Sequence, residues 1–162
     1  MRREQLTAIA ATILLLMIPI LIAGSAPQDF PQWDRLPGWS LQKGFDTTEA
    51  VANGAASWNE RQWSEWLAKQ AGLDGESNST IEVYTYLGKR VDILTPFEAI
   101  EVGWAHHWKE DPSQAKQYSM QTNRPGAVIL LSNGSIGEAE SIASCLSECE
   151  RNGLRMYVQR VP

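Results

Sequence analysis

The stretch TIEVYTYLGKRVDILTPFEAIEVGW, residues 80–104, decides the fold because it contains three short strand patterns in succession. In TIEVYTYL apolar and polar side chains alternate, and after the turn residue Gly88 the segment KRVDILT reads as a second strand. Pro96 then separates a third pattern, AIEVGWA, from the first two. We expect the first two strands to form a hairpin and the third to lie in the same sheet.

Helical patterns flank these strands. Upstream, the S-x-x-E spacing of Ser57 and Glu60 is typical of a capping box. It precedes an apolar helical face made of Trp63, Trp66, Leu67 and Ala71. Downstream, the sequence predicts a helix from Asp111 to about Gln121, a buried strand AVILLS at 127–132, a helix over about 136–151 and a last strand at 154–161. The predicted order is α-β-β-β-α-β-α-β, an α/β domain with helices on both faces of a mixed sheet.

The N-terminus has the pattern of a membrane-directing segment. Arg2 and Arg3 precede an uncharged, apolar run from Leu6 to Gly24. Both a cleaved signal peptide and a retained transmembrane anchor fit a run of about 18 residues. We therefore divide the chain into a signal peptide or anchor at 1–24, a Pro/Gly-rich linker at 25–54 and a folded domain at 55–162. Contact with the membrane through residues 6–24, with the two arginines in the cytoplasm, predicts an exported or membrane-anchored domain on the extracytoplasmic side.

Composition and charge narrow the range of functions that the chain can have. A formal net charge of −5 argues against a broad basic face for nucleic acid. Cys145 and Cys149, the only cysteines, lie one helical turn apart in CLSEC. They fit either a disulfide in an oxidising compartment or two half-buried thiols.

Asp92 and Glu101 are the residues that carry chemical information. Each stands in the middle of a short apolar strand, where a charge is costly unless it has a partner. The two-residue period of neighbouring strands lets both carboxylates reach one surface, where they would make a site for a hard cation such as Mg²⁺. The alternative is a solvated sheet face, or ion pairs with cations such as Lys89, Arg90 or Lys109.

The chain from Glu60 to Ser132 resembles proteins related to the PD-(D/E)XK nucleases of the restriction-endonuclease-like fold. The resemblance rests on ERQW, IEVYTYLGKRVDILT, AIEV, the HHW block and PGAVILL. It also rests on Gln114 and Tyr118, which match the QxxxY element of RecB-like members. Their spacing of four residues puts both on one face of a helix. The α-β-β-β-α-β order is the core of that fold.

The resemblance implies roles for particular residues. Asp92 and Glu101 would bind Mg²⁺, or alternatively Mn²⁺, and Glu60 or Glu82 would be auxiliary acids. Gln114 and Tyr118 would contact phosphate or a nucleobase.

Three positions depart from the family pattern and bear on cleavage rather than on the fold. The Lys that usually follows the Glu by two residues is Gly103, and the Lys expected before the Trp of the HHW block is His107. Ser113 replaces a usual Gly. His107 or Lys109 would then assist catalysis.

Two functions follow as hypotheses. The first is a metal-dependent nuclease, or a degenerate nuclease-like protein, of the cell envelope with nucleic acid as substrate. The alternative is a catalytically inactive, membrane-tethered module that binds an unknown protein partner.

Overall fold

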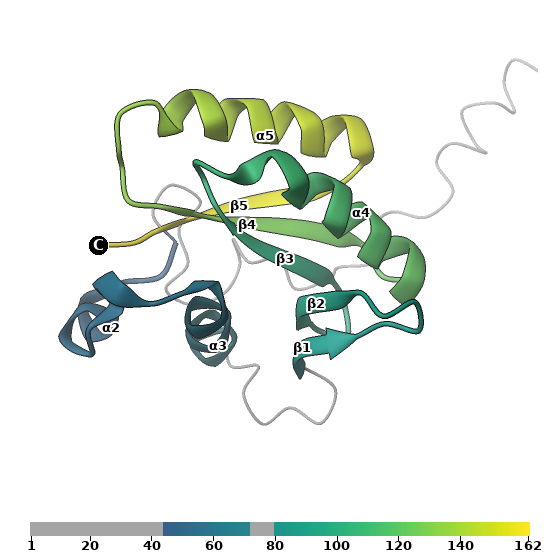
Figure 1. The fold of residues 1–162 in the computed structure, drawn as a ribbon, viewed down its shortest axis with the longest axis horizontal. Coiled ribbons are helices and arrows are strands. Elements are labelled where there is room, and N and C mark those ends of the chain that lie inside the picture. Colours follow the sequence, from purple (N-terminus) through teal and green to yellow (C-terminus); the bar gives the residue numbers. More distant parts are fainter. Residues whose placement is uncertain (1–43, 72–79) are drawn as a thin grey trace, which may run out of the picture. The chain divides into compact units, whose positions relative to one another are not determined.

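The computed structural model describes residues 44–71 and 80–162 (Figure 1). These residues belong to one unit of the chain, Pro31–Pro162. The predicted signal or anchor at 1–24 and the first part of the predicted linker lie outside the described residues. Within the described ranges, no helix combines the length and the apolar character that crossing a membrane requires.

The described chain alternates helices and strands in the predicted order. Its α-helices are α2 (Thr48–Ala52), α3 (Glu60–Gln70), α4 (Asp111–Thr122) and α5 (Glu138–Asn152). Two 3-10 turns, η2 (Ala55–Ser57) and η3 (Trp108–Glu110), precede α3 and α4. The strands are β1 (Thr80–Tyr84), β2 (Arg90–Leu94), β3 (Ala99–Trp104), β4 (Gly126–Ser132) and β5 (Arg155–Arg160). From α3 onward the order is α-β-β-β-α-β-α-β, so the predicted succession and the α/β class are confirmed.

The five strands form one mixed sheet in the order β1-β2-β3-β4-β5. The first three strands pair antiparallel, whereas β3, β4 and β5 pair parallel. Helix α3 lies on one face of the sheet, and α4 and α5 lie on the other (Figure 1). Because helices cover both faces, every residue of β4 is buried, as its continuous apolar run predicts.

Two apolar cores hold these layers together. Against α3, the buried side chains include Trp63, Leu67, Ile100 and Ile129. The core under α4 and α5 contains Ala115, Val128, Leu130, Cys145 and Cys149. Both cysteines are free and buried, with their sulfur atoms 4.0 Å apart, so they contribute to this core as small apolar side chains.

The start of α3 differs from the prediction. The capping box is formed by Asn59 and Gln62, not by Ser57 and Glu60. Asn59 accepts a hydrogen bond from the Gln62 backbone N–H at 3.0 Å, and the Gln62 side chain accepts one from the Asn59 N–H at 3.0 Å. Ser57 ends η2, and its hydroxyl donates to the Gly54 carbonyl, so it does not cap α3.

The folded domain begins before residue 55, the boundary that the sequence predicts. Phe45 is buried in the core on the α3 side. Its backbone N–H donates to Gln159 Oε1 at 2.8 Å, and its carbonyl accepts from Gln159 Nε2 at 3.1 Å. Gln159 of β5 is fully buried. A buried amide therefore docks the segment before α2 onto the sheet.

Replacing Gln159 by Leu keeps a similar volume but removes both partners of the buried Phe45 backbone. We expect Gln159→Leu to lower the free energy of unfolding by about 1–3 kcal/mol, the cost of leaving buried polar groups unpaired. Urea denaturation measures this loss, and Gln117→Leu on the exposed face of α4 is the control, with a change within about 0.5 kcal/mol. Equal stability of the Gln159→Leu variant and the natural protein would contradict the docking role.

Candidate functional site

The site lies next to the point where the backbone pairing of β2 with β3 ends. The two strands pair through Ile93 with Ile100 and Leu94 with Ala99, and one step further this register brings Asp92 opposite Glu101. There the Asp92 side chain bonds to the backbone of β3, because its Oδ2 accepts a hydrogen bond from the Val102 N–H at 2.8 Å. The carboxylate thus replaces a backbone acceptor. This substitution fixes Asp92 beside Glu101.

The two carboxyl groups are in contact and largely removed from water. Glu101 is 7% exposed, and its buried Oε2 has no hydrogen-bond partner. Burial raises the pKa of Glu101, and the adjacent Asp92 raises it further. Burial also raises the pKa of Asp92, although the Val102 N–H opposes this shift. The pKa of Glu101 is raised to about 9 and that of Asp92 to about 6, so Glu101 keeps its proton at neutral pH.

The sequence left two alternatives open for these acids, a solvated sheet face and ion pairs with nearby cations. Neither alternative describes this pair. Among the described residues, no Lys or Arg forms an ion pair with Asp92 or Glu101. Arg90 is close enough to lower the pKa of Asp92, but its guanidinium bonds to Glu82. Two buried acids without a cation are costly to ionise.

A third carboxylate, which the sequence did not single out, faces the pair. Asp111 is the first residue of α4, is 7% exposed, and has a buried Oδ2 without a partner. A Cβ added to Gly103 would lie 2.1 Å from that oxygen, so the glycine leaves room for the carboxylate. Burial, followed by repulsion from Glu60 and Asp92, raises the pKa of Asp111 to about 7.

An open pocket of about 530 Å³ leads to Glu101 and Asp111, whereas Asp92 lies outside its lining. It is lined by residues that include Glu60, Glu101, His107, Lys109, Asp111 and Gln114. Glu60 is the first residue of α3, and its pKa is raised by burial, which His107 and Arg90 partly offset. The pocket therefore gathers most of the residues that the sequence proposed, from α3, β3, the η3 region and α4.

Gln114 and Tyr118 share one face of α4, as their spacing predicts. The Tyr118 hydroxyl donates to Gln114 Oε1 at 3.2 Å. Tyr118 is 3% exposed and lies beside Glu101; burial and then this neighbour raise the pKa of its phenol. Gln114 lines the pocket, whereas Tyr118 lies outside the pocket lining and contacts Glu101.

Glu82, the other proposed auxiliary acid, lies in an arginine bridge instead. Its carboxylate is 3.3 Å from Arg61 Nη1 and 3.1 Å from Arg90 Nη1. The backbone of Glu82 has φ 54°, a left-handed conformation that is strained for a residue with a side chain. Glu82 thus links α3 to β2 and holds two cations near the acidic pair.

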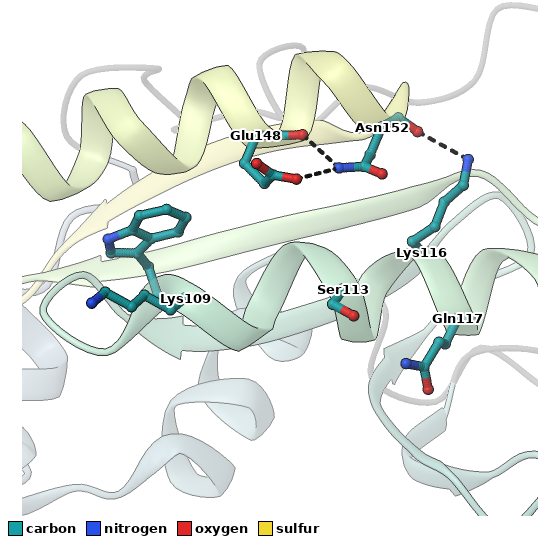
Figure 2. Close-up of a pocket in the computed structure, with 7 residues that line it drawn as sticks. Lys109, Ser113, Lys116, Gln117, Glu148 and Asn152 are labelled. Carbon is teal, nitrogen blue, oxygen red and sulfur yellow. Dashed lines mark hydrogen bonds between the residues drawn. The ribbon is translucent and has the colours of Figure 1, made fainter.

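Lys109 borders a second hollow, which lies between α4 and α5 (Figure 2). In that hollow Lys116 donates to the Asn152 carbonyl at 3.0 Å, and Asn152 Nδ2 donates to Glu148 Oε1 at 2.8 Å. Lys116 therefore caps the C-terminus of α5, a structural role. Lys109 lines both hollows and is the lysine available to a ligand of the acidic pocket.

The donors of the pocket suit a hard divalent cation. Carboxylate oxygens are the ligands preferred by Mg²⁺ and Mn²⁺, and two of those here are buried without partners. Over residues 44–71 and 80–162, no three His, Cys, Asp or Glu side chains already stand as a metal-ligand set. Because burial raises the pKa of Glu101, binding an ion there would require this carboxyl to lose its proton.

No family model, no curated protein and no solved structure matches this chain. The similarity to the PD-(D/E)XK nucleases therefore stays a prediction from the sequence, and the function has to be argued from the site.

The raised pKa values predict how the metal-free protein responds to pH. These carboxyls ionise near pH 4 when unfolded, whereas folding raises the pKa of Asp92 to about 6, of Asp111 to about 7 and of Glu101 to about 9. Their stabilising effect is therefore present below about pH 4 and is lost progressively as the pH rises through these values. Urea denaturation in EDTA measures this loss. The double variant Asp92→Asn/Glu101→Gln should lose less stability between pH 5 and pH 8, by at least about 1.4 kcal/mol. The same pH dependence in both proteins would contradict the buried acid pair.

Proposed function

We propose that this domain is a metal-dependent phosphodiesterase of the nuclease type, with Asp92 and Glu101 as its metal-binding carboxylates. The observation that carries the proposal is the contact of the half-buried Asp92 with the buried Glu101, which lines an open pocket, without a cationic partner among the described residues. Such a pair destabilises the protein at neutral pH, and a bound divalent cation would offset that cost. Unsatisfied buried charge is typical of functional sites.

The surroundings of the pair suit a phosphodiester substrate. Lys109 lines the pocket, and Arg90, which is paired with Glu82, is close enough to act on Asp92. Lys109 is well placed to bind phosphate oxygens, even though the protein as a whole is acidic. The overall charge then favours a short, local contact over binding along an extended duplex.

Each residue has a defined task in this proposal. Bound Mg²⁺ or Mn²⁺ would supply Lewis-acid activation of water and of the phosphoryl group. His107 lines the pocket and is suited to accept the proton of the attacking water near neutral pH. Lys109 contacts the phosphate, and Gln114 orients it with its amide. Tyr118 holds Glu101 in place from α4.

We also propose that the domain has the restriction-endonuclease-like fold. The α-β-β-β-α-β succession and the acids on neighbouring strands support this assignment. The apolar N-terminal run supports an extracytoplasmic location, tethered or exported, where the substrate would be nucleic acid outside the cytoplasm.

A second candidate, a catalytically inactive module that binds a protein partner, is favoured by a different observation. The turn between β1 and β2 exposes three large apolar side chains, since Tyr84 is 70% exposed, Tyr86 79% and Leu87 63%. Exposed apolar groups of this size often contact a partner. The absence of a lysine at Gly103 also favours this candidate.

Cleavage assays decide between the two candidates. The full chain, purified in detergent, is incubated with labelled single-stranded DNA, duplex DNA and RNA in Mg²⁺, Mn²⁺ or EDTA. We expect metal-dependent cleavage that Asp92→Asn and Glu101→Gln each reduce by at least about 100-fold, because each removes a ligand. Glu140→Gln, which removes an exposed charge on α5, serves as the control and should cleave normally.

Two results would contradict the nuclease proposal. Neither cleavage of any substrate nor binding of Mg²⁺ or Mn²⁺ would reject both the activity and the metal site. Metal binding without cleavage would reject the activity and support the partner-binding module.

A further inference from the structure

We propose that Asp111 is a third metal-binding carboxylate of the site, contributed by the first turn of α4. This inference rests on the proposed metal site at Asp92 and Glu101 and adds to it a residue from a separate element. Asp111 is only 7% exposed, and its Oδ2 has no hydrogen-bond partner. The side chain lines the pocket together with Glu101.

A purely structural role does not explain this carboxylate. An acid in the first turn of a helix normally faces water or caps a free backbone N–H. Glu110, the N-cap residue, makes no side-chain capping hydrogen bond in α4, and although the Asp111 carboxylate interacts with its own backbone, its Oδ2 lies buried beside the strand without a partner. Leaving a buried carboxylate oxygen unpaired costs stability. A ligand that binds this oxygen removes the cost.

Gly103 shows that the strand accommodates the acid. The glycine lies two residues beyond Glu101 on β3, so both positions face the same side of the sheet. A Cβ there would lie 2.1 Å from Asp111 Oδ2 and 2.6 Å from its Cγ. Any side chain at this position would therefore displace the carboxylate, and the absence of one lets the Asp111 carboxylate lie beside the acid pair.

Charge supports the same conclusion. Glu60, Asp92, Glu101 and Asp111 act on one another across the pocket. Lys109 lines the same pocket. Arg90 also acts on Asp92 but is paired with Glu82. Arg90 and Lys109 therefore do not neutralise four carboxylates, whereas a divalent cation bound by three of them would do so directly. A third carboxylate also raises affinity for a hard cation.

Calorimetric titration with Mn²⁺ of the full chain in detergent tests this assignment independently of catalysis. We expect Asp111→Asn to weaken Mn²⁺ binding by at least about tenfold. Glu140→Gln is the control, because it removes the same charge from an exposed residue on α5, away from the pocket, and it should change the affinity by less than about threefold. Asp92→Asn should weaken binding more than either.

Thermal unfolding in EDTA separates a ligand from a structural residue. Because the metal-free protein leaves Asp111 unpaired, Asp111→Asn should unfold at the same temperature as the natural protein or at a higher one. A structural residue would instead lower the unfolding temperature, and this result would overturn the assignment.

The remaining outcomes are also decisive. Unchanged Mn²⁺ affinity in Asp111→Asn, with loss in Asp92→Asn, would overturn the role of Asp111 and leave the proposed function intact. Absence of Mn²⁺ binding by the natural protein would overturn the metal site as a whole.

Discussion

The contact of Asp92 with Glu101 is the constraint on which the rest of the site depends. Glu101 is buried and Asp92 half-buried, and among the described residues neither is paired with a cation. The Val102 N–H holds Asp92 in place, and Tyr118 packs beside Glu101. The fold keeps this unfavourable pair because β2 and β3 are fixed by their own packing between α3 and α4. A cost of this kind persists where a ligand offsets it.

The starts of two helices bring acids from both faces of the sheet to one pocket. Glu60 and Asp111 are the first residues of α3 and α4, helices that lie on opposite faces of the sheet (Figure 1). Both point into the pocket beside Glu101. The positive N-terminal ends of two helices thus lie near a cluster of negative groups. The same pocket is lined by Lys109, the cation that the proposed phosphodiester substrate would meet.

Sequence reasoning predicted the fold well where side-chain periodicity is strong. The hairpin, the buried strand at β4 and the acids at Asp92 and Glu101 follow from a period of two residues. The capping box at Asn59 and the docking of Phe45 on Gln159 were missed, because short polar residues near a helix start are interchangeable in pattern and a distant amide contact leaves no local signal. Glu82 was placed among the metal acids, since spacing does not reveal an arginine bridge.

Asp111 was missed for a related reason, because an acid before a proline at a helix start is ordinary. The available signal was Gly103, whose missing side chain on the face of Glu101 leaves space for a group from elsewhere.

The most direct measurement is a crystal structure of the protein soaked in Mn²⁺, with data collected for anomalous scattering. We expect an anomalous peak in contact with the carboxylates of Asp92 and Glu101. A fully occupied Mn²⁺ elsewhere, with these two side chains still in contact with each other, would contradict their role as metal ligands.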